Sequence, residues 1–378
     1  MKPQFINEIL FPVIRTSLGL SSFVPNISFD DIQQLKLIGK SQSILPIIWE
    51  GLRKMVIQKD WEDEIKGDIY QCMCRFVWRE ESIKEICRAL DNNRIAYILL
   101  KGASIQNLYP EAWMRTSNDI DVLVHEEEIS AAISAIENET TFKAGEKGYH
   151  DVSLTNENYH LELHFSLKEK EERIDPLLSR AWDYSERIDN GYQCDFKPDY
   201  KIFYVIAHMA HHFTNGGIGI RPIIDLWLLL RKTAYDNDEL ADLLCSCGLL
   251  KFYEKCCDLM SVWIDGKEHT ETTRLMERYF LSGGALGSQS LANVARQRHN
   301  RGWKYVVSRI WVPSYELMAY YGDDSNANHT ELYYQIKRWK SWMKKGRRKE
   351  LNKQISDLSN TKKNEILEFG RLLDELEL

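Results

Sequence analysis

Two aspartates, Asp119 and Asp121, interrupt the otherwise apolar run "DIDVLV". Alternate residues of a strand project from the same face, so both carboxylates would point to one side while Ile120 and Val122 pack on the other. Ionised carboxylates in such a position repel each other and lose hydration, so the pair requires a proton or a cation. Carboxylate oxygens favour Mg²⁺ or Mn²⁺, and Mg²⁺ usually keeps positions for waters and substrate phosphates. We therefore predict a divalent-metal site whose missing ligands belong to a nucleotide.

A third carboxylate stands in the later run "YHLELHF", where His160, Glu162 and His164 alternate with apolar residues. If this strand lies beside the first, Glu162 completes the metal site or takes the proton from an attacking hydroxyl. The alternative is that Glu162 lies on the solvated face of an edge strand. The two histidines then either orient Glu162 or lie in solvent.

The run "LLKGAS" upstream of the aspartates predicts a turn from a strand into a short helix. Its backbone N–H groups, at Lys101, Gly102, Ala103 and Ser104, would bind phosphates, because the start of a helix presents unpaired donors and a favourable dipole. Arg115, between this turn and the aspartates, could meet a triphosphate through two parallel hydrogen bonds. A surface salt bridge is the alternative for Arg115.

Polar residues also occur within a later helical pattern, in "HMAHHF" and "RPIIDLW". We predict substrate or phosphate contacts for Arg221, Asp225 and a histidine, which is His208 or one of His211 and His212. His164 of the earlier strand is a further candidate for such a contact. The alternative is a set of buried polar residues that joins two helices. His208 and His212 have the i, i+4 spacing of a zinc pair, but the segment offers no third ligand, so zinc is not favoured.

The periodicity of apolar residues divides the chain into helices, a small sheet and more helices, an α+β fold class. Asn92–Asn93 ends the first helical region, and Gly216–Gly217 separates two later helices. Further helical segments are expected near 237–264, 270–281, 288–311 and 329–345. A mixed β-sheet module is thus flanked by N-terminal and C-terminal helical regions. The strands are expected at 95–100, 119–124, 151–155 and 159–167. The expected regions are 1–92 (helical), 93–198 (the α/β module), 199–346 (a helical domain on the substrate or nucleotide side) and 347–378 (a helical tail).

The stretch "LLKGASIQNLYPEAWMRTSNDIDVLV" resembles the bacterial family of uncharacterised nucleotidyltransferases, which belongs to the polymerase β-like nucleotidyltransferase superfamily. The later "LELHFSL" and "AHMAHHF…GIRPIIDLWLLL" are similar to the same family, so the resemblance spans roughly residues 95–232. It implies that Gly102 takes the turn position, that Asp119 and Asp121 are metal ligands, and that Glu162 is the third carboxylate. Ala103 stands where the superfamily has a second Gly or Ser, and Ser104 follows it.

These observations together predict a Mg²⁺-dependent nucleotidyltransferase. An acceptor hydroxyl would attack the α-phosphate of an NTP such as ATP, and pyrophosphate would leave. The acceptor stays open: a small hydroxylated molecule, a sugar, a protein side chain and an RNA end all fit. The alternative is a catalytically inactive binding or regulatory protein that keeps the fold.

Composition limits the other function classes. A formal charge of −7 gives no global attraction for nucleic acid, and 44% hydrophobic with 28% charged residues is typical of a globular protein. No window approaches the roughly 18 unbroken apolar residues of a membrane span, and the N-terminus makes a poor signal peptide, so we expect a cytoplasmic protein. The basic run "QIKRWKSWMKKGRRKE" could contact nucleic acid or an anionic membrane surface, but a solvated helix is favoured.

Overall fold

The computed structural model describes residues 5–21, 26–55, 59–188, 190–283 and 363–378. The segments expected to be helical near 288–311 and 329–345, and the basic run among them, lie outside the described residues. None of the described helices combines the length and the apolar character that crossing a bilayer would take.

A mixed sheet forms the centre of the α/β module, with the strand order β3-β4-β5-β2-β1-β7-β6 among the described residues. The pairs β2·β5 and β1·β7 are parallel, and the remaining neighbours are antiparallel. The strands are β1 (Tyr97–Leu99), β2 (Asp119–Val124), β3 (Lys143–Lys147), β4 (Asp151–Thr155), β5 (His160–His164), β6 (Ser185–Arg187) and β7 (Gln193–Phe196). The four strands expected from the sequence are confirmed, whereas β3, β6 and β7 were not predicted.

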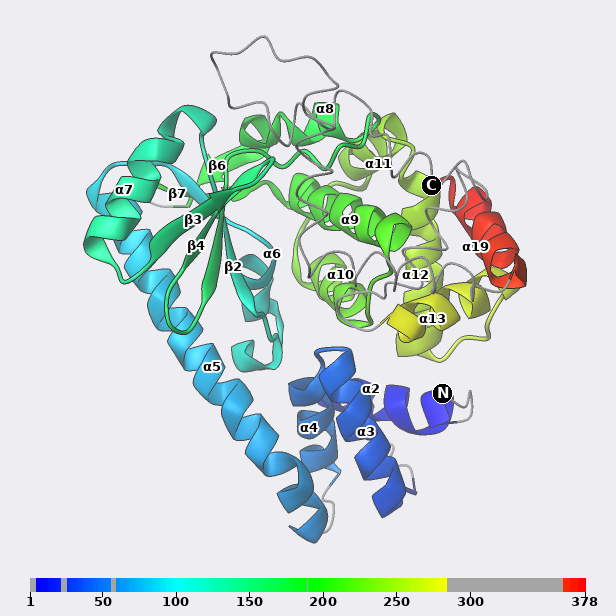
Figure 1. The fold of residues 1–378 in the computed structure, drawn as a ribbon. Helices are drawn as coiled ribbons and strands as arrows, with labels where there is room; N and C mark the ends of the chain where they lie inside the picture. Colours follow the sequence, from blue (N-terminus) through cyan, green and yellow to red (C-terminus); the bar gives the residue numbers. More distant parts are fainter. Residues whose placement is uncertain (1–4, 22–25, 56–58, 189, 284–362) are drawn as a thin grey trace, which may run out of the picture.

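β2 occupies the middle of this sheet, between β5 and β1, and this position explains its apolar sequence. Ile120, Val122 and Val124 are buried in one core cluster with residues of α5 (Lys59–Asn92) and α7 (Ile129–Glu139). Those helices therefore cover one face of the sheet (Figure 1). The opposite face of β2, which carries Asp119 and Asp121, is turned toward α9 and α10.

The helices before and after the sheet module form a second body of the molecule (Figure 1). Before the sheet lie η1 (Ile6–Leu10), α2 (Phe11–Ser17), α3 (Phe29–Ser41) and α4 (Leu45–Lys54). Short elements within the module are α6 (Lys101–Ile105), η2 (Gln106–Leu108), η3 (Ala112–Met114), η4 (Glu126–Glu128), α8 (Asp175–Leu178) and η5 (Ala181–Tyr184). After it come α9 (Pro198–Asn215), α10 (Arg221–Lys232), α11 (Asn237–Ser246), α12 (Leu250–Asp265), α13 (Glu271–Gly283) and α19 (Lys363–Leu376).

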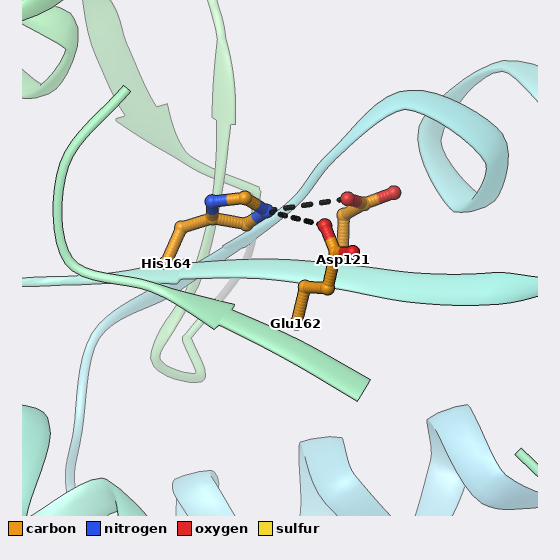
Figure 2. Close-up of side chains that lie close together, drawn as sticks. All are labelled: Asp121, Glu162 and His164. Atoms are coloured by element: carbon orange, nitrogen blue, oxygen red, sulfur yellow. Dashed lines mark hydrogen bonds and ion pairs between the residues drawn. The ribbon is translucent and has the colours of Figure 1, made fainter. Parts of the chain in front are cut away.

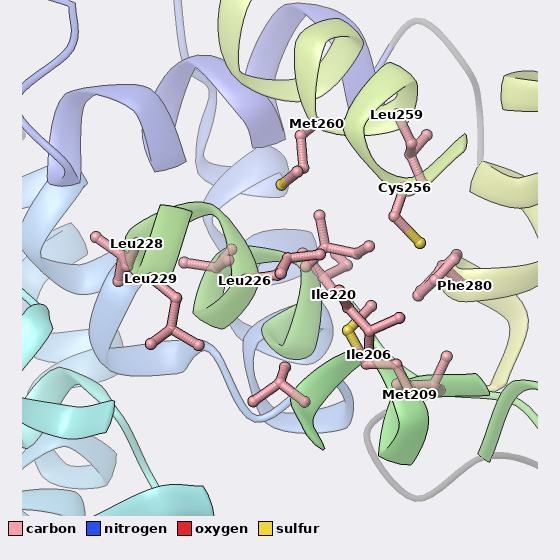
Figure 3. Packing of buried hydrophobic residues seen from close by; sticks show 14 of the residues in the cluster. Ile206, Met209, Ile220, Leu226, Leu228, Leu229, Cys256, Leu259, Met260 and Phe280 are labelled. Carbon is pink, nitrogen blue, oxygen red and sulfur yellow. The ribbon is translucent and has the colours of Figure 1, made fainter. Parts of the chain in front are cut away.

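The N-terminal and C-terminal helices share one hydrophobic core, although they lie far apart in the sequence. Phe11 of α2 stacks on Trp263 of α12 with ring centroids 4.8 Å apart, and Arg15 Nε donates to the Trp263 carbonyl at 2.9 Å. Figure 3 shows the packing of α9, α10, α12 and α13 through residues such as Ile206, Ile220 and Phe280. Packing in this core positions α9 and α10 opposite the sheet face that carries Asp119 and Asp121.

Glycines set two of the helix ends. Gly216 and Gly217, with φ of 156° and 89°, follow the last residue of α9, which confirms the predicted stop. Gly248, with φ of 67°, lies between α11 and α12, so the single helical segment expected near 237–264 is in fact two helices. A left-handed backbone at this position is easy for glycine and ends the helix.

Candidate active site

Parallel pairing of β2 and β5 brings two of the predicted carboxylates together. Asp121 and Glu162 are register partners, which confirms the neighbouring strand positions assumed from the sequence. His164, two residues further along β5, places Nε2 3.2 Å from Asp121 Oδ1 and 3.5 Å from Glu162 Oε2 (Figure 2). Each of the three side chains offers a ligand atom, and these atoms lie within 4.8 Å of one another. The three residues form a group that could hold a metal ion.

Asp119 lies beside this group rather than within it. It lines the same pocket as Asp121, as the alternation of the strand predicts. Its carboxylate accepts a hydrogen bond from Ser117 Oγ at 2.9 Å. The compact ligand group therefore contains His164, for which the sequence left two roles open, while Asp119 offers a further oxygen from the preceding position of the strand face.

Lys101 supplies the positive charge that compensates Asp121 in this structure. Its Nζ lies 3.0 Å from Asp121 Oδ1, the oxygen that also faces His164. Asp121 is only 3% exposed. Burial opposes the charged form of both groups, but their mutual attraction dominates, so the pKa of Asp121 is lowered and the pKa of Lys101 is raised. For His164, burial lowers the pKa, but the hydrogen bonds with Asp121 and Glu162 outweigh it and raise the pKa overall.

Gly102 is required at the turn because another segment approaches it closely. A Cβ at this position would lie 2.7 Å from Arg115 Nη1 and 2.9 Å from Ser117 Oγ. Lys101 lines the pocket, but Gly102, Ala103 and Ser104 are not among its lining residues. Ser104 Oγ donates instead to the Lys101 carbonyl at 3.1 Å. Phosphate binding by this turn stays a prediction.

Arg115 is engaged in a buried ion pair with Asp225 of α10. Its Nη2 lies 2.9 Å from Asp225 Oδ2 and its Nε 3.3 Å from Oδ1, while Tyr109 OH donates to Oδ1 at 2.7 Å. Burial lowers the pKa of Arg115, but Asp225 outweighs it and raises the pKa overall. The surface salt bridge considered for Arg115 is wrong, because both partners are buried. The third nitrogen, Nη1, donates to the Thr116 carbonyl at 3.3 Å and to Ser117 Oγ at 3.4 Å, so all three guanidinium nitrogens are engaged within the protein. A triphosphate contact by Arg115 stays a prediction.

Histidines of α9 form the wall opposite the carboxylates, together with Glu169, which the sequence did not indicate. The Glu169 oxygens lie 3.6 Å from His208 Nδ1 and 3.5 Å from His211 Nε2, and the rings of His208 and His212 are 4.3 Å apart. Burial and the Lys101 charge lower the pKa of His208 to about 3, and burial with the His211 charge lowers that of His212 to about 4. Both rings are therefore neutral at pH 7.

Arg221, at the start of α10, lines the same pocket and has a hydrogen-bond donor that is not used within the protein. Its Nη1 donates to the Thr116 carbonyl at 2.9 Å, but its buried Nε has no partner. Within the described part of the chain, no carboxylate oxygen lies within 4.0 Å of its guanidinium. Burial and the neighbouring Arg115 charge lower the pKa of Arg221 to about 10, so it is a cation at neutral pH. It is suited to an anionic group that enters the pocket.

These side chains surround one pocket of about 400 Å³ between the sheet and helices α9 and α10. It contains every residue discussed as a metal ligand and both Lys101 and Arg221. Several lining residues were not found from the sequence. The polar ones are Ser117, His150, Ser166, Glu169 and Tyr204. Tyr204 had a signal, because it precedes His208 by one helical turn.

Comparison with known proteins identifies the family of this chain. Residues 30–265 match the model of a family described as uncharacterised nucleotidyltransferase. The match covers more than half of the chain, and the chain belongs to this family. No curated protein matches it.

One solved structure to which the chain is similar is a solution structure of the antibiotic-resistance factor ANT(2″)-Ia, described as revealing substrate-regulated conformation dynamics. The identity is 11%, the match covers 48% of this chain and 95% of that chain, and the TM-score is 0.35.

Proposed function

We propose that this protein is a Mg²⁺-dependent nucleotidyltransferase, which transfers a nucleoside monophosphate from an NTP such as ATP to a hydroxyl acceptor. The observation that carries this proposal is the group of Asp121, Glu162 and His164 in the pocket of a chain that belongs to a nucleotidyltransferase family.

The donors of this group fit a divalent cation. Two carboxylates supply the hard oxygen ligands that Mg²⁺ and Mn²⁺ prefer, and the buried Asp121 already requires a neighbouring positive charge. Asp119, on the same strand face, would add a further oxygen. When bound, the cation would neutralise charge that develops on the phosphates.

The residues of the chain then have separate roles in the transfer. Arg221 and Lys101 would bind the triphosphate, because both are cations on the pocket wall. Glu162 would accept the proton of the acceptor hydroxyl as its oxygen forms a bond to the α-phosphorus. The bond from the α-phosphorus to the bridging oxygen breaks, and pyrophosphate leaves with that oxygen. His164, 3.5 Å from Glu162, would hold this carboxylate in place.

The rival proposal is a binding or regulatory protein with an inactive nucleotidyltransferase fold. The group of Asp121, Glu162 and His164 favours the enzyme, since a protein without turnover has no need for two adjacent carboxylates, one of them buried, that face a pocket.

Incubation with each α-labelled NTP, Mg²⁺ or Mn²⁺ and a cell extract tests the proposal and searches for the acceptor. We expect label on one component of the extract and release of pyrophosphate. Asp119→Asn or Asp121→Asn should abolish transfer in a folded protein, while Asp183→Asn, at an exposed carboxylate of η5, should not. Metal-dependent NTP binding without transfer to any component would favour the regulatory protein, and near-normal transfer by both site variants would exclude the metal centre.

A further inference from the structure

The middle of helix α5 carries an exposed apolar stripe on the side of the helix that faces away from the protein. Tyr70, Val77 and Trp78 are 59%, 55% and 52% exposed, and Met73 is 36% exposed. Cys74 is also exposed. Their spacing of three, four, seven and eight residues from Tyr70 puts all five on one helix face. We call these five residues the α5 stripe.

The rest of α5 shows that this exposure is not a general property of the helix. Ile65 and Ile69 are buried against the N-terminal helices, and Ile83, Ile86 and Leu90 are buried under the sheet. These residues lie on the opposite face of α5 from the stripe. Figure 1 shows α5 as a long diagonal helix along one edge of the molecule. Single exposed apolar residues are normal on a protein, but five that share one face of a helix mark an interaction surface.

We propose that the α5 stripe is the contact between two copies of this chain, which pair their α5 helices antiparallel about a two-fold axis at Cys74. A two-fold contact requires a surface that is complementary to itself. Tyr70 stands four residues before Cys74 and Trp78 four residues after it. In this arrangement each Tyr70 packs on the Trp78 of the other copy, and the two Cys74 side chains lie next to each other at the axis.

Charges on the same face of α5 support the antiparallel direction. Lys66 precedes Cys74 by eight residues and would fall between Glu81 and Glu85 of the other copy. Asp63 would fall opposite Glu85 of the other copy, a like charge that Lys84 and Arg88 flank. All six side chains are exposed, so they are available at the rim of such a contact. The two-fold axis places the Lys66 of one copy beside the acidic pair of the other on each side of the apolar centre, and this pairing favours the antiparallel direction and the register.

The oligomeric state of the full chain, measured by sedimentation over a range of concentrations, tests the proposal. We expect a dimer that dissociates on dilution. Val77→Ser combined with Trp78→Ser should weaken self-association at least about tenfold, because buried aromatic residues carry most of the energy of a contact. Leu37→Ser, at an apolar side chain of α3 that is 68% exposed and lies outside the α5 stripe, should leave self-association unchanged. A monomer at every concentration, or a dimer that the α5 double variant does not weaken, would overturn the proposal.

Charge reversal distinguishes the proposed register from any other use of the stripe and does not touch apolar residues. Lys66→Glu should weaken the dimer, and addition of Glu81→Lys in the same chain should restore it, because the two positions meet between copies. A short bismaleimide should join two chains through Cys74. This product should disappear in Cys74→Ser and persist in Cys245→Ser, which removes another exposed cysteine. No recovery in the double charge variant, together with crosslinking that survives Cys74→Ser, would exclude the antiparallel α5 contact.

Discussion

Lys101→Met tests whether the Lys101 ammonium holds the place of a divalent cation beside Asp121. Removal of one partner of a buried ion pair costs about 3–5 kcal/mol, because the other charge is left uncompensated. Asp121 is 3% exposed, but the Lys101 side chain is 23% exposed and His164 still faces the same oxygen. We therefore expect a loss near 3 kcal/mol, which corresponds to a fall of roughly 4 °C in Tm for a chain of 378 residues that unfolds as one unit.

A divalent cation should reverse most of this loss, because it would meet Asp121 without competition from the ammonium. At a Mn²⁺ concentration about 100 times its Kd, binding to the folded protein alone contributes about 2.7 kcal/mol. Thermal unfolding across a Mn²⁺ titration would then show a larger rise in Tm for Lys101→Met than for the unaltered protein. Lys201→Met is a matched control, since it breaks the Lys201–Asp195 pair outside the pocket. An equal metal-induced rise in Tm for Lys101→Met and the unaltered protein would refute the reasoning.

Three further variants test the pocket. Glu162→Gln should keep metal-dependent nucleotide binding but lose turnover about 100-fold or more, as measured with the true acceptor, if Glu162 accepts the proton. Gly102→Ala should destabilise the protein by about 1–3 kcal/mol in urea unfolding, because the added methyl group would collide with the Arg115 guanidinium, which Asp225 holds in place. Gly67→Ala is the control and should not destabilise the protein, because the space around Gly67 is open. The His208 ring is neutral in the folded protein, with a pKa of about 3, while the unfolded chain binds a proton below about pH 6.5. The free energy of unfolding should thus fall as pH is lowered from 7 to 4, and His208→Gln should flatten that dependence of Tm on pH.

The sequence was sufficient for those parts of the fold that carry a periodic apolar pattern. β5 alternates apolar and polar residues, and β2 begins with such an alternation before a short apolar run. Their positions and the face that carries Asp121 and Glu162 could therefore be predicted. β3 could not, because all five residues of "KAGEK" are exposed and no apolar residue marks a buried face. β7 is a short strand next to the edge strand β6. Its partner β1 lies nearly a hundred residues earlier in the chain, so no nearby sequence feature indicates the pairing.

The electrostatic partners of the site are the part that the sequence could not provide. Arg115 and Asp225 are separated by 110 residues and meet only because the helical body holds α10 against the sheet. Lys101 was predicted as part of a phosphate-binding turn, but its contact with Asp121 depends on how the turn approaches the next strand. Glu169 lies just beyond the end of β5, where strand alternation no longer determines which way a side chain points.

Charge pairing across the pocket determines what it can accept. Asp225 compensates Arg115 and Lys101 compensates Asp121, while His211, whose pKa is raised by Glu171 and Glu169 against the effect of burial, lies beside Glu169. On the sheet side, Glu162 is faced by two histidines, His164 at 3.5 Å and His160 at 3.8 Å, and the contact of Asp119 is the neutral hydroxyl of Ser117. On the helix side, Arg221 has a buried donor with no partner. A ligand that satisfies both walls must therefore present positive charge to the sheet and negative charge to α10, and a divalent cation bound to a nucleoside triphosphate has this polarity.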